Sequence, residues 1–241
     1  MNNCVIIQAR MTSTRLPGKI MLPVAGKSLL EHQIGRVLKS KKISNIIIAT
    51  TINSTDDVVV KLCENLNVNY FRGSENDVLG RYYYAAEKYK ASNVIRITSD
   101  CPLYSPLILD EMLEKYENSD VDYLSNTLTR TYPRGLDTEI FTFKTLEKCF
   151  NESTEQIFRE HVTSYIYKNP SIFKMKNYSG DVDNSYLRWT VDTAEDFELI
   201  KKIYDYFLPL NPNFDYEDIM QAYQIYPEWK KINSHIEQKK I

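Results

Sequence analysis

The chain has 241 residues, with 30 Lys and Arg against 32 Asp and Glu, so its formal net charge is -2. This near balance argues against a protein whose main task is to grip nucleic acid, because such proteins carry a clear basic excess. A hydrophobic fraction of 43% and a charged fraction of 26% exclude a disordered, collagen-like or all-charged chain. The length fits one large domain or two small ones, and a single α/β domain is common at this size.

The cysteines and the apolar segments indicate the cellular compartment of the protein. Cys4, Cys63, Cys101 and Cys149 are widely spaced and form no CxxC pair, which predicts neither a zinc site nor a disulfide framework. We expect buried thiols in a reducing cytosol. The first residues lack the apolar region and cleavage site of a signal peptide. No apolar stretch approaches the roughly 18 residues of a membrane-spanning helix, so we expect a cytoplasmic protein.

The first 126 residues alternate between short β-branched runs and amphipathic segments. The predicted strands are Cys4–Ile7, Ile46–Thr50, Val68–Phe71, Val94–Ile97 and Val121–Leu124. The predicted helices are Leu29–Leu38, Asp56–Leu66, Asp77–Tyr89 and Ser105–Tyr116. This alternation is typical of βαβ units, with a mainly parallel sheet and helices on both faces. Ligands bind beyond the carboxyl ends of such strands, so the polar residues there are the first candidates for a site.

The pattern changes in residues 127–188, which we interpret as an insertion that closes over the sheet edge and builds a dimer contact. The predicted strands are Glu139–Phe143, Phe173–Tyr178 and Tyr186–Thr190, and the predicted helices are Thr145–Phe150 and Gln156–Lys168. Residues 189–241 read as a return segment with helices at Thr193–Phe207 and Tyr216–Tyr223. No repeat or Pro/Gly/Ser-rich linker marks a boundary, so residues 1–241 are predicted to form one domain around the 1–126 core.

The segment after the first strand, residues 8–19 (QARMTSTRLPGK), is the richest in ligand-binding groups. Arg10, Arg15 and Lys19 supply cations, and a Pro-Gly turn supplies backbone N–H groups, which together suit a polyphosphate. The alternative is a solvated basic loop. We favour the phosphate site because parallel sheets bind ligands at this position. Residues 21–28 only imitate a P-loop, since the first glycine and the preceding strand are missing; Ser28 is expected to cap the next helix.

Two aspartates follow apolar segments and have two readings each. Asp100 ends the fourth strand before a Pro turn, where it suits a divalent cation or, equally, caps the turn or the helix beginning near Ser105. Asp192 precedes a helix, and with Glu195 it reads better as an N-cap in a capping-box-like pair.

Two further clusters carry candidate ligand contacts. Residues 71–81 (FRGSENDVLGR) mix turn residues with Arg72 and Arg81, which suits contacts to a base, a ribose or another substrate group; the alternative is an ordinary strand-to-helix loop. Residues 132–137 and 159–161 lie in the insertion. His161 is a candidate base or donor there, although a single His is more often structural.

These motifs resemble those of the cytidylyltransferases that make CMP-activated acidic sugars, the CMP-KDO and CMP-sialic acid synthetases. The resemblance is closest to the branch named for spore coat polysaccharide biosynthesis protein F. That branch typically shows QARMxSxRLPGK, FRGSExDVLxRYY, RITxDCPL, YPxGLDxE, REHVTxYIY and LRWTVDxxED. Each has a counterpart here, so the resemblance covers nearly the whole chain.

The resemblance implies a Rossmann-like, GT-A-like nucleotidyltransferase fold, in which a mainly parallel sheet forms the middle of a three-layer sandwich. It implies transfer of CMP from CTP to a sugar or sugar-acid acceptor with release of pyrophosphate, for surface polysaccharide or glycoconjugate biosynthesis. It also implies Mg²⁺ and a homodimer. The resemblance does not identify the acceptor sugar, because the KDO and sialic acid enzymes carry different residues in the insertion. It also leaves open which base the nucleotide carries.

The resemblance also assigns roles to residues. The implied catalytic residues are Arg10, Arg15, Lys19, Asp100 and Asp192. Among them Asp100 and Asp192 hold Mg²⁺, a role compatible with capping. The expected nucleotide contacts are Gln8, Ala9, Arg10, Ser13, Arg15, Lys19, Arg72, Ser74, Asp77, Thr98 and Asp100. The expected substrate contacts are Arg81, Tyr132, Arg134, Asp137, Glu139, His161 and Arg188.

Two other functions stay open at this point. A glycosyltransferase that uses a preformed nucleotide sugar would want an Asp-x-Asp motif after a central strand. Asp120-Val-Asp122 and Asp181-Val-Asp183 match the letters but not the placement. A catalytically silent nucleotide- or sugar-binding subunit is the third reading, and the intact set of Arg, Lys and Asp argues against it.

Overall fold

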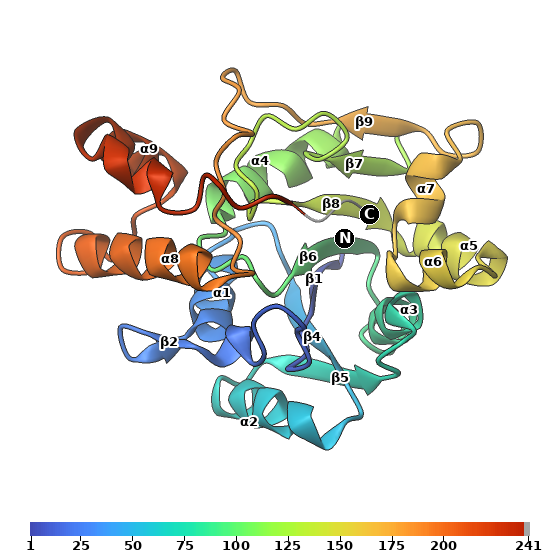
Figure 1. The fold of residues 1–241 in the computed structure, drawn as a ribbon. Coiled ribbons are helices and arrows are strands. Elements are labelled where there is room, and N and C mark those ends of the chain that lie inside the picture. Colours follow the sequence, from blue (N-terminus) through green and yellow to red (C-terminus); the bar gives the residue numbers. More distant parts are fainter. Residues whose placement is uncertain (239–241) are drawn as a thin grey trace.

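A computed structural model of the chain describes residues 1–238, and within them a seven-stranded sheet forms the centre of the molecule (Figure 1). The strands are β1 (Asn3–Gln8), β4 (Asn45–Thr51), β5 (Asn69–Gly73), β6 (Asn93–Thr98), β7 (Tyr123–Ser125), β8 (Glu139–Thr142) and β9 (Met175–Asn177). Their order across the sheet is β5-β4-β1-β6-β8-β7-β9. A separate two-stranded hairpin consists of β2 (Pro23–Val24) and β3 (Lys27–Ser28).

The sheet is mainly parallel, as predicted, with one antiparallel strand. β5, β4, β1 and β6 run parallel to one another, and β9 runs parallel to β7, whereas β8 runs antiparallel to both of its neighbours, β6 and β7. β8 and β9 both come from residues 127–188, so that part of the chain extends the sheet as well as covering it. The prediction that it contributes substrate and dimer contacts stays a prediction.

Helices cover both faces of the sheet (Figure 1). One face carries α1 (Leu29–Val37), α2 (Asp57–Asn65), α4 (Pro106–Glu117), α8 (Ala194–Phe207) and α9 (Tyr216–Ile225). The other carries α3 (Val78–Lys88), α5 (Phe143–Glu152), α6 (Gln156–Glu160) and α7 (Ser164–Lys168). Short 3-10 turns are η1 (Lys19–Met21), η2 (Ser54–Asp56) and η3 (Pro227–Lys231).

Alternation along each strand produces the two cores. Val5 and Ile7 of β1 point into one core, and Cys4 and Ile6 point into the other, because successive side chains of a strand face opposite ways. Strands that are buried on both faces have nearly continuous apolar sequences, and this pattern allowed the positions of these strands to be predicted. All four cysteines are buried and free, as expected. None of the helices in residues 1–238 combines the length and apolar character needed to cross a membrane.

The helix caps confirm one prediction and correct another. Ser28 caps α1, where its hydroxyl accepts a hydrogen bond from the backbone N–H of Glu31. At α8 the cap is Thr193, and Asp196 completes a reciprocal capping box. Asp192 and Glu195 therefore do not form the predicted capping pair, and the Asp192 carboxylate is available for other contacts.

Two elements of the insertion differ from prediction. The predicted helix Gln156–Lys168 is two short helices, α6 and α7, because the chain breaks at residues 161–163, where Val162 has a φ of 29°. The predicted strand Tyr186–Thr190 is not a strand: it makes a single bridge, between Arg134 and Arg188. Side-chain contacts replace the ladder there, since the Trp189 indole donates to the hydroxyl of Tyr223 at 2.8 Å.

Candidate active site

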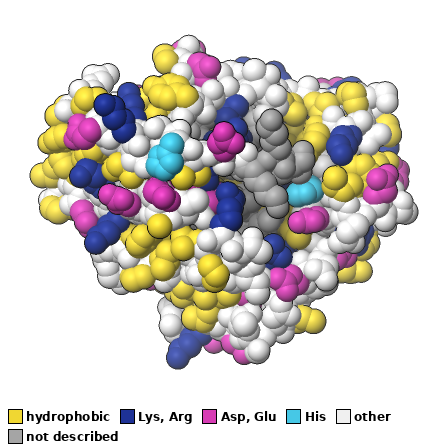
Figure 2. Space-filling view, in the orientation of Figure 1, with side chains coloured by type: hydrophobic (Ala, Val, Ile, Leu, Met, Phe, Trp, Pro, Cys, Tyr) yellow, Lys and Arg dark blue, Asp and Glu magenta, His cyan; other side chains and the backbone are white. Residues whose placement is uncertain are grey.

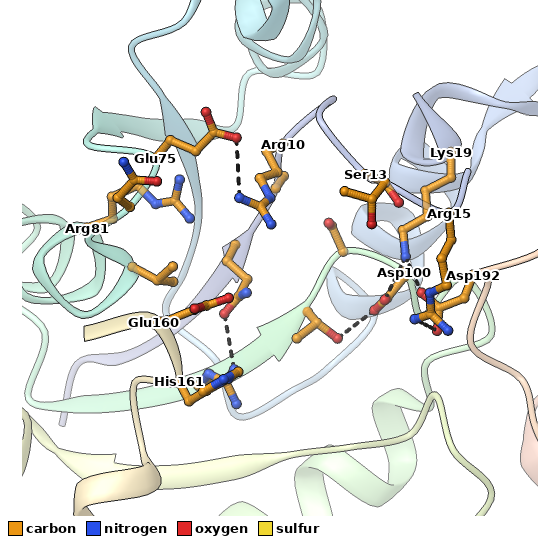
Figure 3. A pocket seen from close by; sticks show the side chains of 18 of the residues that line it. Arg10, Ser13, Arg15, Lys19, Glu75, Arg81, Asp100, Glu160, His161 and Asp192 are labelled. Carbon is orange, nitrogen blue, oxygen red and sulfur yellow. Dashed lines mark hydrogen bonds and ion pairs between the residues drawn. The ribbon is translucent and has the colours of Figure 1, made fainter. Parts of the chain in front are cut away.

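A cavity of about 360 Å³ lies at the carboxyl ends of β1 and β6 (Figure 3). It is lined by residues from 8–19, from 75–81, from 96–100 and from 156–161, together with Asp192. In the space-filling view, basic and acidic side chains lie close together near the middle of the face shown (Figure 2). The predicted ligand edge of the parallel sheet therefore holds a polar cavity.

A buried carboxylate shapes the loop after β1. Asp56 accepts hydrogen bonds from the backbone N–H of Met11 at 2.8 Å and from the hydroxyls of Thr50 at 3.1 Å and Thr51 at 2.5 Å. The loop closes where the Gly18 N–H donates to the Met11 carbonyl at 2.9 Å. Gly18 has a φ of 70°, a left-handed conformation that glycine adopts without strain. These contacts fold residues 10–19 over the end of the sheet.

Five predicted site residues converge at one end of the cavity. The Lys19 ammonium lies 2.9 Å from Oδ2 of Asp100 and 2.7 Å from Oδ1 of Asp192. Arg15 approaches the other oxygen of Asp192 at 2.7 Å. The Thr98 hydroxyl donates to Asp100 at 2.6 Å. Two carboxylates from distant parts of the sequence thus share the Lys19 ammonium, and the expectation that they hold Mg²⁺ stays a prediction.

The charges of this cluster shift the pKa values of Lys19 and Asp100. Burial alone would lower the pKa of Lys19, but the two neighbouring carboxylates outweigh burial and raise it above its ordinary value. For Asp100, burial raises the pKa, and Lys19 with the Thr98 hydroxyl more than reverses this, so the pKa falls to about 2. Lys19 therefore stays charged and Asp100 stays ionised at neutral pH.

The return segment, residues 189–241, is hydrogen-bonded directly to the end of β6. The Val191 N–H donates to the Asp100 carbonyl at 2.9 Å, and the Thr190 hydroxyl donates to the same oxygen at 3.2 Å. Buried Arg188 donates to Asp192 at 2.7 Å and to Asp196 at 2.8 Å. Arg188, expected to contact substrate, does not line the cavity; it positions the carboxylate of Asp192.

The donor set at this end fits a divalent cation. Asp100 and Asp192 present carboxylate oxygens to the same point, and hard cations such as Mg²⁺ take one or two carboxylates plus phosphate oxygens. Within residues 1–238 no group of three or more His, Cys, Asp and Glu is arranged to hold a metal. A cation bound by this pair would need further oxygens from a substrate, as in many phosphoryl-transfer sites.

The opposite end of the cavity is built around Glu75 and two arginines (Figure 3). Arg10 lies 3.3 Å from Oε1 of Glu75, and the Asn53 amide donates to Oε2 at 2.6 Å. The Thr12 hydroxyl also donates to this carboxylate and is the main reason that the pKa of Glu75 is lowered. Arg81 reaches the same wall from α3 and is almost fully buried.

A second cavity of about 180 Å³ shares Arg96, Thr98 and His161 with the first. Its wall includes Asp137 and Glu139, both predicted substrate residues. Arg130, which the sequence did not single out, forms a fork with Asp137, with Nη2 to Oδ2 at 2.7 Å. Arg96 pairs with Glu139, which also accepts from the Thr163 hydroxyl at 2.6 Å.

Several predicted ligand contacts are used elsewhere in the fold. Arg72 turns away and donates to the carbonyls of Thr51 at 2.8 Å and Asn53 at 2.9 Å. Asp77 caps α3 through the N–H of Gly80 at 2.9 Å and pairs with Arg159.

Three others also lie outside both cavities. Tyr132 stacks on Tyr178, and the backbone N–H of Arg134 donates to the Leu187 carbonyl at 3.0 Å. Ser74 lines neither cavity. The assignment of these positions to nucleotide or substrate contacts is not supported by their geometry.

The structure adds residues that sequence reasoning missed. The additional lining residues are Thr14, Glu75, Asn76, Val78, Arg96, Ser99, Gln156 and Glu160 in the first cavity and Thr127, Arg130, Thr163 and Tyr167 in the second. Arg96 had a usable signal, because a cation inside the apolar run Val94–Ile97 rarely lacks a purpose. Glu160 lay in the cluster 159–161 but received no role, and Gln156 had no signal, since it lies on a short helix that the sequence joined to its successor.

Comparison with known proteins agrees with this arrangement. Residues 4–239 match the family described as cytidylyltransferase. An uncharacterised protein of Methanocaldococcus jannaschii is 40% identical over 97% of this chain and 95% of its own length. Spore coat polysaccharide biosynthesis protein SpsF of Bacillus subtilis is 36% identical over 83% of this chain and 85% of its own length.

Solved structures show the same fold. A cytidylyltransferase from Leptospira borgpetersenii superimposes with a TM-score of 0.91 at 36% identity over the whole of both chains. The CMP:2-keto-3-deoxy-manno-octonic acid synthetase complexed with CTP shares the fold, with a TM-score of 0.64 at 16% identity over 85% of this chain and 99% of its own. The fold, the cations clustered at the cavity and the full-length match lead to one conclusion: the chain belongs to the cytidylyltransferase family.

Proposed function

We propose that this protein transfers CMP from CTP to a hydroxyl of a sugar or sugar acid and releases pyrophosphate. The observation that carries the proposal is the convergence of Lys19, Asp100 and Asp192 at the carboxyl ends of the strands, beside a loop rich in cations. The synthetase that shares the fold is described as a complex with CTP, which supports the choice of nucleotide.

The cations of the first cavity match the charge of a triphosphate. Arg15 and Lys19 lie at the end that holds the two carboxylates, and Arg10 lies toward the other end (Figure 3). Guanidinium and ammonium groups stabilise the charge that builds on the leaving pyrophosphate. Lys19, kept protonated by its two carboxylate neighbours, supplies a permanent positive charge for this purpose.

Asp100 and Asp192 would hold the Mg²⁺ that accompanies the nucleotide. The ion would neutralise phosphate charge and favour deprotonation of the attacking hydroxyl. The protein's own contribution is position: Arg188 and the backbone bonds to the Asp100 carbonyl fix both carboxylates before the substrate arrives. Preorganised charges of this kind need no rearrangement at the moment of reaction.

The second cavity is the natural place for the acceptor. It adjoins the first through Arg96, Thr98 and His161, so an acceptor hydroxyl there lies near a nucleotide bound in the first. Its carboxylates, guanidinium and hydroxyl groups can donate to or accept from the several hydroxyls of a sugar. Placement of both reactants in line is a large part of what such enzymes contribute. The name of the Bacillus relative supports a role in surface polysaccharide or glycoconjugate synthesis.

A pyrophosphate-release screen tests the proposal. Each of the four ribonucleoside triphosphates is combined with a panel of 2-keto-3-deoxy acids, sugar phosphates and polyol phosphates, with and without Mg²⁺. We expect release with CTP, Mg²⁺ and one acceptor class. Absence of release with CTP across the panel, while another triphosphate reacts, would contradict the choice of nucleotide.

The glycosyltransferase alternative receives no support from the structure. Asp120 is exposed and pairs with Lys174 at 2.6 Å, and Asp122 accepts from the Lys174 backbone at 2.8 Å. Asp181 and Asp183 lie in a loop and line neither cavity. Neither Asp-x-Asp sequence therefore reaches the place where a nucleotide would bind. The silent-subunit alternative requires CTP binding without pyrophosphate release, so calorimetry with CTP, run beside the screen, tests it.

A further inference from the structure

The C-terminal segment, residues 227–238, runs back from α9 toward the sheet (Figure 1). Buried Trp229 anchors it, since its ring packs edge-on against a tyrosine of α8 with ring centroids 5.3 Å apart. Beyond this anchor, Asn233 is buried again, and Gln238 reaches the guanidinium of Arg188 at 2.5 Å. The segment thus brings two amide side chains to one arginine.

The Asn233 amide uses both of its N–H groups on this arginine and its partner. It donates to the Arg188 carbonyl at 2.9 Å and to Oδ1 of Asp196 at 2.8 Å. The same Oδ1 accepts from Nε of Arg188 at 2.8 Å. Asp196 is fully buried, so its carboxylate depends on such donors. Asn233 therefore holds Arg188 at its backbone and through the carboxylate that pairs with it.

Every nitrogen of the Arg188 guanidinium has a partner. Nε and Nη2 donate to Asp196 at 2.8 and 3.0 Å, and Nη2 also donates to Asp192 at 2.7 Å. Nη1 donates to Gln238. A planar guanidinium that is engaged at each nitrogen cannot rotate without breaking one of these bonds. The C-terminal segment thus helps to fix the orientation in which Arg188 meets Asp192.

Asp192 depends on Arg188 more than on its other cations. Three cations contact its carboxylate, and their side chains are 38% exposed for Arg15, 11% for Lys19 and 4% for Arg188. Arg15 and Lys19 line the first cavity, where they would share their charge with the phosphates of a nucleotide, whereas Arg188 lines neither cavity. Arg188 is therefore the partner that can hold Oδ2 of Asp192 before and after a nucleotide binds.

We propose that Asn233 and Gln238 are positioning residues that set the affinity of Asp192 for the divalent cation. The inference rests on the proposed function, since it assumes that Asp192 binds the ion that accompanies the nucleotide. Neither amide lines a cavity, so both act through Arg188. Loss of a partner behind a metal ligand typically costs 10- to 100-fold in metal affinity or activity.

Nucleotide-dependent binding of Mn²⁺, a paramagnetic replacement for Mg²⁺, tests the inference. EPR measures the Mn²⁺ affinity of each full-length protein with CTP, with the protein in excess so that the nucleotide is bound. Calorimetry with CTP in EDTA measures the affinity for the nucleotide alone. Asn233→Ala should bind Mn²⁺ roughly 10-fold more weakly than the wild type. Its metal-free CTP affinity should be unchanged, because the cations of residues 10–19 are untouched.

Asn184→Ala is the matched control. Asn184 is also buried, and its amide donates to the Tyr216 hydroxyl at 2.8 Å rather than to Arg188 or Asp196. Both variants lose a buried amide, so both should melt a few degrees below the wild type. The Mn²⁺ affinity should fall in Asn233→Ala and stay at the wild-type value in Asn184→Ala.

Gln238 offers a second test that does not disturb the core, because its side chain is exposed. Gln238→Ala should weaken nucleotide-dependent Mn²⁺ binding by roughly twofold to tenfold, the range that one net hydrogen bond supplies. Gln238→Glu keeps an acceptor oxygen for Arg188 and should bind Mn²⁺ at least as tightly as the wild type. This pair tests the inference even if Asn233→Ala fails to fold.

Two results would overturn the inference. One is wild-type Mn²⁺ affinity in the folded Asn233→Ala and Gln238→Ala variants. The other is an equal loss of Mn²⁺ affinity and of metal-free CTP affinity, which would make the two amides structural supports of the whole site. Failure of the proposed function would look different, because the wild type would then bind CTP neither with the ion nor without it.

Discussion

Asp100 receives a hydrogen bond from the Thr98 hydroxyl at 2.6 Å and lies 2.9 Å from the Lys19 ammonium. Both contacts come from residues beside it in the fold, one at the end of β6 and one in the loop after β1. The carboxylate is thus ionised and fixed at the point where a triphosphate would lie. Its removal should affect chemistry far more than folding, because Lys19 keeps Asp192 as a partner.

Asp100→Asn should lower kcat by roughly 100-fold or more, the scale expected when one preorganised electrostatic contact to the reacting phosphate is lost. The measurement is the steady-state rate of pyrophosphate release, with circular dichroism to verify folding. Glu198→Gln is the control, since Glu198 is an exposed acidic residue on α8. A variant that keeps normal turnover and normal Mg²⁺ dependence would exclude Asp100 from the metal site.

Single residues also show where sequence reasoning succeeded. The cations of residues 10–19 could be assigned because they follow a strand end, a position that the topology makes a ligand site. Arg72 follows a strand end as well, but its guanidinium turns back to the carbonyls of Thr51 and Asn53. Residue type and spacing carry no information on which way such a flexible side chain turns. Asp192 was assigned to the site only by family resemblance, since its local sequence favours a cap; it does line the first cavity, and its metal role stays a prediction.

At the scale of elements, the turn at residues 132–137 meets the return segment through a glycine. Gly135 has a φ of 106°, and a Cβ there would lie 2.7 Å from the backbone N of Thr190 and from the carbonyl carbon of Trp189. This close backbone approach lies two residues before Asp192. The glycine therefore sets the distance between the turn and the segment that supplies one proposed metal ligand.

Gly135→Ala should destabilise the protein by about 3 kcal/mol, from conformational strain and the backbone clash together. Gly26→Ala is the control, because Gly26 has a φ of 81° but no described atom outside its immediate neighbours lies within 4 Å of the position that a methyl carbon would take. It should cost only about 1 kcal/mol, the conformational part alone. Urea unfolding measures both values. Equal losses would show that the contact with the return segment does not matter.

His32 connects three elements and should make stability depend on pH. It lies in α1, its Nε2 is 2.7 Å from the Val24 carbonyl of β2, and its ring is 4.1 Å from that of Tyr204 in α8. Burial lowers the pKa of His32 and outweighs the opposing hydrogen bond to Val24; Lys27 and Arg36 lower it further and Glu31 raises it.

The sign follows from the lowered pKa of His32. Between the folded pKa and the unfolded value near 6.5, the unfolded chain binds the extra proton. The stability contributed by His32 is therefore complete above about pH 6.5 and is lost as the pH falls below it. The free energy of unfolding, measured in urea from pH 8 to pH 5, should fall less steeply for His32→Gln than for the wild type. Exposed His235 is the control, and His235→Gln should keep the wild-type slope; an unchanged slope in His32→Gln would contradict the prediction.

The elements that could be predicted share one property: their apolar pattern is local. β1, β4 and β6 are nearly continuous apolar runs, and α1, α3 and α4 have clear apolar faces and caps. The break at His161–Thr163 and the missing strand at Tyr186–Thr190 involve tertiary contacts instead. The Thr163 hydroxyl donates to Glu139, the Trp189 indole donates to the Tyr223 hydroxyl, and the Asn233 amide donates to the Arg188 carbonyl. Such contacts join residues that no local window compares.

At the scale of the whole molecule, the net charge of -2 conceals a strong local separation. The sheet gathers its cations and two distant carboxylates at one edge, and the antiparallel strand β8 brings Glu139 from the insertion beside Arg96. Sequence reasoning anticipated the sheet and its ligand edge. It could not anticipate that β8 enters between β6 and β7, because strand order is decided by pairing over long distances. The second cavity exists because of that order.

The most direct test of the central claim is a ³¹P NMR spectrum of one reaction with CTP, Mg²⁺ and the acceptor found by the screen. A cytidylyltransferase of this kind should produce equal amounts of pyrophosphate and of a phosphodiester between CMP and the acceptor. Asp100→Asn under the same conditions should leave CTP essentially unreacted. Formation of CDP and a phosphorylated acceptor, or of inorganic phosphate without the diester, would contradict transfer of CMP and with it the proposed function.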